Sequence, residues 1–206
     1  MARKTAFDPA EKLEQAMTLF WQKGYEATSI QDLVDALGIN RFSLYNSFGD
    51  KQALFQLALD HYLEQVSRKR MAPLLCDKGG LAALYGWLDA LALRLSQPDN
   101  PGCFLQNTQL GGAMDQPRVR ERILDMHREL QQALAHACQV AMQEGDLAPK
   151  TDVEALARFL FVHVQGWVLL GKGGGHDDTL RADMTTLRQQ LALWQRHPIL
   201  GSESAN

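Results

Sequence analysis

Between residues 28 and 51, apolar positions recur at the spacing of a short helix and then stop at a glycine. Gly38 ends this predicted helix, and a second short helix follows at Asn40 or Arg41. The inward positions lie three or four residues apart, as a helix requires: Ile30, Leu33, Val34 and Leu37 in the first helix, Ile39 in the turn, and Leu44 and Phe48 in the second. Two helices joined by a three-residue turn around a glycine predict a helix-turn-helix, whose second helix can enter a DNA major groove.

The rest of the chain shows the same helical periodicity. A helix is predicted to begin at Pro9, behind the capping residue Asp8, and to end at Gly24. Thr151 and Glu154 are expected to form another capping box. Further helices are predicted over 51–70, 81–95, 103–113, 117–144, 152–170 and 177–196. No stretch alternates apolar and polar residues for long enough to predict a strand, so the expected fold class is all-α, with about nine helices.

Composition excludes several classes of protein. At 206 residues and 46% hydrophobic, the chain can bury a substantial core. No apolar run follows the basic start, and the apolar stretch 159–170 is too short to span a bilayer, so we expect a cytoplasmic protein without a membrane partner. Cys76, Cys103 and Cys138 are odd in number and widely spaced, and the six histidines show no paired-ligand spacing. We therefore expect no disulfide, no metal and no cofactor.

Net charge gives no general attraction to nucleic acid, because the chain carries a formal charge of −3. Any affinity for DNA must come from the placement of a few cations near phosphates. The candidates are Arg3, Lys4, Arg41 and Lys51. Lys51 opens a helix, where a positive charge is electrostatically disfavoured, so an external anion is its expected partner.

The first 66 residues resemble the DNA-binding domain of the TetR family of bacterial transcriptional regulators. The matching features are Phe20 and Gly24-Tyr25, Thr28-Ser29-Ile30, Leu37-Gly38-Ile39, and the series Leu44-Tyr45, Phe48, Lys51 and Leu54. The remaining two thirds resemble the family in helix count, length and apolar content. The resemblance implies a DNA-binding domain over 6–66, a ligand-binding and dimerisation domain over 67–197, and a flexible tail over 198–206.

The same resemblance implies how the protein works. It predicts a homodimer joined by its last two helices, about 152–170 and 177–196, that binds a palindromic operator as a repressor. A small-molecule inducer, apolar or electrophilic, would bind among the C-terminal helices and release the operator. A dimer presents two recognition helices about one helical turn apart, and a rotation of the helix that starts at Lys51 would spoil that distance.

Carried onto this chain, the family's base-reading positions are Gln31, Arg41, Phe42, Ser43, Asn46 and Ser47. Arg41 is suited to guanine, Asn46 to adenine and Phe42 to a thymine methyl group. Thr28, Tyr45 and Lys51 match phosphate-contacting positions. Ser29, beside Thr28, completes the predicted DNA-binding set. Phe42 and Ser47 depart from the commonest family residues, so the operator sequence does not transfer from relatives.

Candidate inducer-binding residues are large apolar or polar side chains of the later helices. Cys103 follows Pro-Gly at a helix start, where the helix dipole favours a reactive thiolate; the alternative is a small buried hydrophobe. Each other candidate has the same alternative, a place in the core. The set is Trp87, Cys103, Phe104, Asn107, Met114, His127, Phe159, His163 and Trp167.

Two other classes of function remain open on sequence alone. One is a helical small-molecule-binding protein or enzyme with a vestigial helix-turn-helix, and the other is an adaptor that uses the helix-turn-helix as a scaffold. No nucleophile with a base, carboxylate pair or cofactor loop can be placed on matching faces, so we expect no enzymatic activity.

Overall fold

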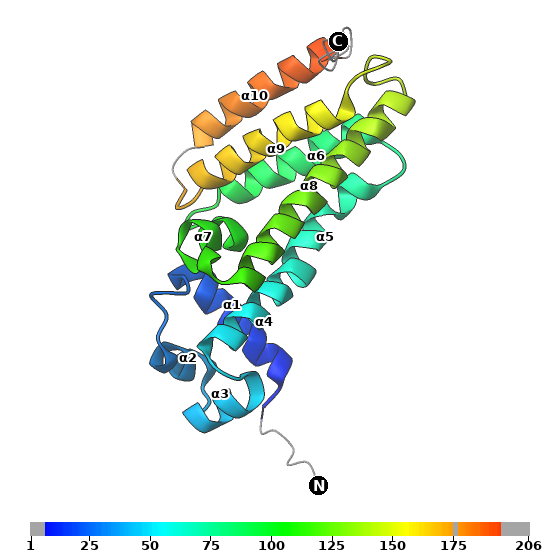
Figure 1. Cartoon of the computed structure of the whole chain (residues 1–206). Helices are drawn as coiled ribbons and strands as arrows, with labels where there is room; N and C mark the ends of the chain where they lie inside the picture. Colours follow the sequence, from blue (N-terminus) through cyan, green and yellow to red (C-terminus); the bar gives the residue numbers. More distant parts are fainter. Residues whose placement is uncertain (1–6, 175–176, 195–206) are drawn as a thin grey trace. The chain divides into compact units, whose positions relative to one another are not determined.

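Within residues 7–174 and 177–194, which the computed structural model describes, the chain forms helices and no strand (Figure 1). Nine α-helices have seven or more residues, and a tenth, α5, is a single turn. The predicted all-α class with about nine helices is therefore confirmed. The predicted tail 198–206 and the predicted phosphate neighbours Arg3 and Lys4 lie outside the described residues.

The helices follow the predicted ranges closely. They are α1 Pro9–Lys23, α2 Ile30–Leu37, α3 Arg41–Phe48, α4 Lys51–Tyr62, α5 Arg68–Met71, α6 Gly80–Leu95, α7 Phe104–Leu110, α8 Pro117–Gln143, α9 Val153–Leu170 and α10 Asp177–Trp194. Short 3₁₀ turns cover Ala72–Leu75 and Ala113–Asp115.

The helix predicted over 51–70 is not uniform. After Tyr62 the backbone makes a π-helical turn, Leu63–Ser67, before α5. A π turn inserts one extra residue, which moves the apolar stripe around the helix axis. Tyr62 and Leu63, at the start of this turn, are both buried, as are the adjacent pairs Leu54–Phe55 and Ala58–Leu59 of α4.

Side-chain caps begin the first four helices. Oxygens of Asp8, Ser29, Asn40 and Asp50 each accept a backbone N–H of the following turn. The capping box predicted at Thr151 is wrong by one residue, because the residue that caps α9 is Asp152. Asp152 caps α9 by accepting from Ala155 N at 2.9 Å, because the Thr151 hydroxyl is committed to the preceding turn, donating to Ala148 O at 2.7 Å.

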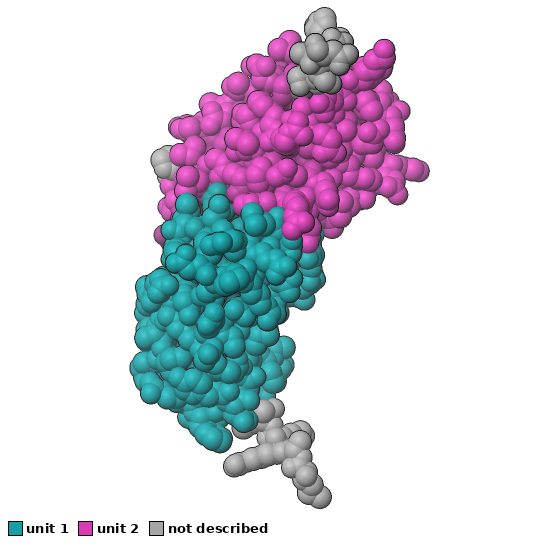
Figure 2. Space-filling model, viewed as in Figure 1, with its two compact units in different colours: residues 1–68, 103–125 teal, residues 69–102, 126–206 magenta. Residues whose placement is uncertain are grey.

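The described contacts divide the chain into two compact units (Figure 2). Unit 1 comprises residues 1–68 and 103–125, and unit 2 comprises residues 69–102 and 126–206. Unit 1 thus holds α1–α4 together with α7 and the first turns of α8. The sequence-based boundary at residue 66 falls near the first division, and it stays a prediction.

The core of unit 1 is a chain of edge-to-face aromatic rings. The Phe55 ring lies 5.1 Å from Phe20 of α1 and 5.7 Å from Phe104 of α7, measured between centroids. Tyr62 lies 5.6 Å from Phe104 and 5.0 Å from Trp21. Edge-to-face pairs add about 0.5–1.5 kcal/mol each beyond their buried area. These rings fix α7 against α1 and α4.

Unit 2 packs α6 closely on α8. A Cβ at Gly80 would stand 2.1 Å from Ala141 N, so only glycine allows this approach. The N–H groups of Gly79 and Gly80 donate to the two Glu144 carboxylate oxygens at 2.9 Å each, which caps α6 from a distant part of the chain. Arg188 of α10 pairs with Asp89 of α6.

Candidate functional site

The helix-turn-helix is built by local signals. Gly38 adopts a left-handed conformation, φ 62° and ψ 30°, which ends α2 and turns the chain toward α3. Asn40 Oδ1 accepts from Ser43 N at 2.8 Å and starts α3. Leu37 and Leu44 are buried, so one face of each helix is held against the core of unit 1.

The opposite face of α3 is accessible. Arg41, Phe42, Tyr45 and Asn46 are exposed, whereas Ser43 and Ser47 are half-buried at its edges. The Phe42 side chain, 78% exposed, is a large apolar group that nothing in unit 1 covers. The face therefore offers a guanidinium, an amide, hydroxyls and an apolar ring on one short helix, which are the groups that read base edges in a major groove.

The predicted residues around the start of α2 divide into two kinds. Gln31 is exposed, and its amide donates to Asp35 Oδ1 at 2.8 Å. Ser29 is exposed, and it forms a reciprocal capping box with Asp32. Thr28, in contrast, is completely buried and its hydroxyl donates to Gly24 O at 2.6 Å. Thr28 therefore fixes the loop before α2, and we leave it out of the proposed interface.

Lys51 is the first residue of α4 and lies against an aromatic ring. Its Nζ is 4.3 Å from the ring centroid of Tyr25, a cation–π contact that offsets the unfavourable position of a cation at a helix N-terminus. Burial, followed by the charges of Glu26 and Asp50, raises the pKa of Tyr25. Sequence reasoning missed this role of Tyr25, although the Gly24-Tyr25 pair was among the features of the resemblance.

An ion pair ties α1 to α2. Lys23 Nζ lies 2.7 Å from Asp32 Oδ1. This hydrogen bond, together with those from Ser29, holds the pKa of the Asp32 carboxyl well below its usual range. The carboxylate beside the recognition elements is therefore neutralised by a lysine at neutral pH.

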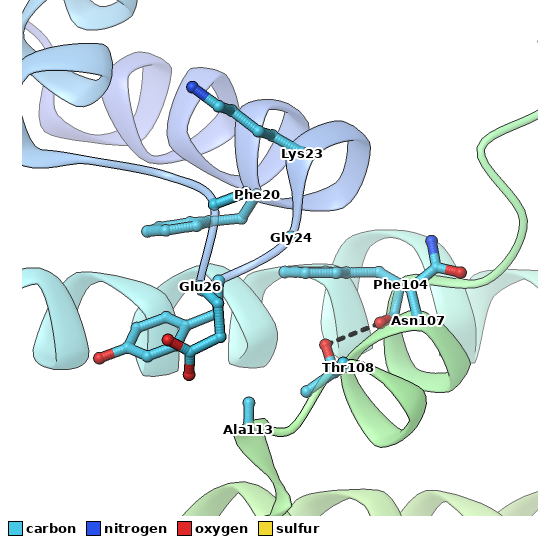
Figure 3. Close-up of a pocket in the computed structure, with 11 residues that line it drawn as sticks. Phe20, Lys23, Gly24, Glu26, Phe104, Asn107, Thr108 and Ala113 are labelled. Carbon is cyan, nitrogen blue, oxygen red and sulfur yellow. Dashed lines mark hydrogen bonds between the residues drawn. The ribbon is translucent and has the colours of Figure 1, made fainter.

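The predicted inducer-binding residues are divided between the two units. Cys103, Phe104, Asn107 and Met114 lie in unit 1, and the other five lie in unit 2. Phe104 and Asn107 line a cavity of about 160 Å³ that lies entirely within unit 1 (Figure 3). Cys103 is half-buried, and the Tyr62 hydroxyl donates to its Sγ at 3.6 Å.

The five candidates of unit 2 are spread over three helices. Phe159, His163 and Trp167 follow one another along α9, with ring centroids 4.1 Å and 6.1 Å apart. Trp87 lines an open groove with Arg70 and Arg94 among its neighbours, and its Nε1 donates to Arg70 O at 2.8 Å. The last candidate is His127 of α8, whose pKa burial lowers.

An exposed polar face on the second helix of a helix-turn-helix defines the chain as a DNA-binding protein of that class. Two family models match it: "Bacterial regulatory proteins, tetR family" over residues 13–58, and "Tetracyclin repressor-like, C-terminal domain" over residues 80–191. The chain belongs to the TetR family, as the sequence motifs predicted, and it is a ligand-responsive, DNA-binding transcriptional regulator.

Individual relatives agree with this assignment. The HTH-type transcriptional repressor ComR of Escherichia coli K12 is 35% identical over 193 residues, which cover 90% of each chain. The transcriptional regulator YezE of Bacillus subtilis 168 is 32% identical and covers 78% of this chain and 84% of its own. A solved structure of a cysteine mutant of the regulator CifR with 26-bp operator DNA matches with a TM-score of 0.79 and 30% identity, over 93% of this chain and all of CifR.

Proposed function

We propose that this protein is a cytoplasmic homodimeric repressor that binds a palindromic operator through two α3 helices and is released by a small-molecule inducer. The observation that carries the proposal is the outward face of α3, where Arg41, Phe42 and Asn46 are all exposed on a helix anchored by buried Leu44. Relatives named as repressors support repression as the effect, and the CifR structure with operator DNA supports binding to an operator.

Each contact of the proposed interface has a chemical basis. Arg41 is assigned to guanine, Asn46 to adenine and Phe42 to a thymine methyl group, each read from the major groove. Gln31, Ser43 and Ser47 border this face. Tyr45, Lys51 and Ser29 are assigned to phosphates, where they set the register of the protein on the duplex.

The proposed dimer interface is the uncovered side of α9 and α10. Val162 is 65% exposed and Leu169 and Leu193 are 51% exposed, although all three are apolar. Only 33% of α9 is buried within the chain. Among the described helices, α9 alone is long and apolar enough to cross a membrane, a test that core helices of soluble proteins also pass. A second copy of the chain would cover this side of α9 and α10, because a palindromic operator has two half-sites and each needs a recognition helix.

The interface on DNA can be tested with the full-length protein and a duplex selected by it from a random-sequence pool. Fluorescence anisotropy should show that Arg41→Ala costs about 1–3 kcal/mol on that duplex and relaxes sequence preference. Lys51→Ala should weaken binding to all sequences and lower the salt dependence by about one counterion. Lys78→Ala removes an exposed lysine in unit 2 and serves as the charge-matched control. Wild-type behaviour of both test variants would reject the assignment.

The dimer can be tested independently. Val162→Arg places a charge on the proposed interface and should convert the dimer to monomers in native mass spectrometry, since a buried unpaired charge is costly. Leu75→Arg is the control, because Leu75 is 56% exposed but lies on the short 3₁₀ turn after α5. A dimer that survives Val162→Arg unchanged would show that the subunits meet elsewhere.

A further inference from the structure

The cavity of unit 1 lies between α7 and the loop that joins α1 to α2 (Figure 3). Its apolar walls are the rings of Phe20, Tyr25 and Phe104 and the methyl groups of Ala27 and Ala113. A Cβ added at Gly24 would meet nothing within 4 Å. The cavity is partly open to solvent, and its apolar part is lined by rings and small residues, as a site for a flat apolar molecule would be.

The size of the cavity limits what it can hold. Its volume is about 160 Å³, and an engineered apolar cavity of about 150 Å³ in another protein binds benzene. One six-membered ring with a single substituent is therefore about the size of this cavity.

The polar part of the lining favours a hydrogen-bond donor on that ring. The Thr108 hydroxyl is already used, donating to Phe104 O at 2.8 Å, and Lys23 is paired with Asp32 at 2.7 Å. The carboxylate of Glu26 is the charged acceptor of the lining, and the Thr108 hydroxyl oxygen can also accept. A carboxylate in the lining disfavours an anionic ligand and accepts from an O–H.

We propose that this cavity binds a single-ring phenol and that its occupancy lowers affinity for DNA through Tyr25. The proposal rests on the proposed function, since it identifies the chemical class and the place of the inducer. It locates the inducer against α1 and the loop that leads to α2, which belong to unit 1 together with α7.

Of the three aromatic side chains that line the cavity, Tyr25 is the one that a ligand can displace. All three rings contact Phe55, Tyr25 with centroids 4.7 Å apart, but Phe20 and Phe104 are at most 1% exposed. Tyr25 is only half-buried, so a ring entering the cavity displaces it more readily than the two phenylalanines.

Displacement of Tyr25 reaches the DNA-binding surface in two ways. The Tyr25 ring makes a cation–π contact with Lys51, whose Nζ is 4.3 Å from the ring centroid, and Lys51 is a proposed phosphate contact. The Tyr25 backbone belongs to the loop that ends at Thr28, whose hydroxyl fastens the loop to Gly24 O at 2.6 Å immediately before the capping box of α2. A shift of this loop therefore disturbs both the first residue of α4 and the start of α2.

Binding is tested first, without DNA, by ligand-observed NMR of phenol on the full-length protein. Ala113→Leu places three more carbons in the cavity and should lower the affinity for phenol by about tenfold or more. Ala27→Leu does the same from an exposed position at the rim, where misfolding is not a concern. Ala82→Leu, exposed on α6 in unit 2, is the matched control and should bind phenol as wild type does. Benzoate should bind at least about tenfold more weakly than phenol, because its charge faces Glu26.

Coupling is tested by anisotropy on the selected duplex with and without saturating phenol. Wild type should lose about tenfold in affinity for the duplex, and Tyr25→Leu should reduce this response to less than about twofold. If the protein binds the duplex but phenol does not bind, or if Ala113→Leu and Ala27→Leu both leave phenol binding unchanged, the cavity assignment is overturned. Phenol that binds without altering duplex affinity overturns the coupling. If phenol binds but no duplex does, the proposed repressor function fails while the site stands.

Discussion

Gly80 provides a sharp test of how unit 2 is packed. It is the first residue of α6, and its Cα lies against the backbone of α8. A Cβ built there would stand 2.1 Å from Ala141 N, 2.6 Å from Ala141 Cα and 2.8 Å from Ala137 O. All three are backbone atoms, which cannot rotate away as a side-chain terminus can. Gly80→Ala must therefore push α6 and α8 apart.

The expected cost follows from three opposing contributions. Overpacking of a filled interior costs about 1–3 kcal/mol. The displacement also weakens the two 2.9 Å bonds from Gly79 and Gly80 to the Glu144 carboxylate, and loss of a helix cap costs about 1 kcal/mol. Alanine regains about 1 kcal/mol over glycine through helix propensity. We therefore expect Gly80→Ala to lower the free energy of unfolding by about 2 kcal/mol.

Gly86 supplies the matched control, because it lies on the same helix and an added Cβ meets nothing within 4 Å. Gly86→Ala should raise the free energy of unfolding by about 0.5–1 kcal/mol. Urea denaturation followed by circular dichroism, at one protein concentration for all variants, gives both values. A Gly80→Ala protein as stable as Gly86→Ala would show that α6 and α8 are not in contact at this point.

Three further predictions concern caps, charges and thiols. Asn40→Ala removes the cap of α3 and should cost about 1 kcal/mol in urea denaturation and weaken operator binding. Asn40→Asp should restore the stability but not operator binding, because it adds a negative charge next to Arg41. Wild type should have a larger free energy of unfolding than Asp32→Asn at neutral pH. This difference should shrink as the pH falls below about 4 toward the lowered pKa of Asp32, because protonation breaks the pair with Lys23. A difference in unfolding free energy that does not depend on pH would contradict this. Burial raises the pKa of Cys138 to about 12, whereas Cys76 is exposed. Iodoacetamide at pH 8 should therefore label Cys76 and leave Cys138 unmodified, as measured by peptide mass spectrometry. Equal labelling of the two cysteines would refute the burial of Cys138.

The helix-turn-helix could be predicted because its determinants are local. Gly38 sets the turn by its own conformation, Asn40 caps the next helix, and Leu44 and Phe48 lie four residues apart on one face. Contacts between distant segments leave no such signal. Thr28 was expected at the DNA because of the motif around it, but its burial depends on how the loop folds back on α1, a tertiary property that the sequence pattern does not contain.

Large side chains alone identify only part of the proposed ligand site in unit 1. Of the predicted residues, Phe104 and Asn107 do line the cavity. The space itself exists because the neighbouring positions Gly24 and Ala113 are small, and small residues are conspicuous only after the fold brings them together. Gly24 also ends α1 with φ 83°, a conformation that side chains rarely adopt. The residue that stops the helix thus also leaves room for a ligand, so a substitution at this position should disturb the start of α2 and the proposed phenol site together.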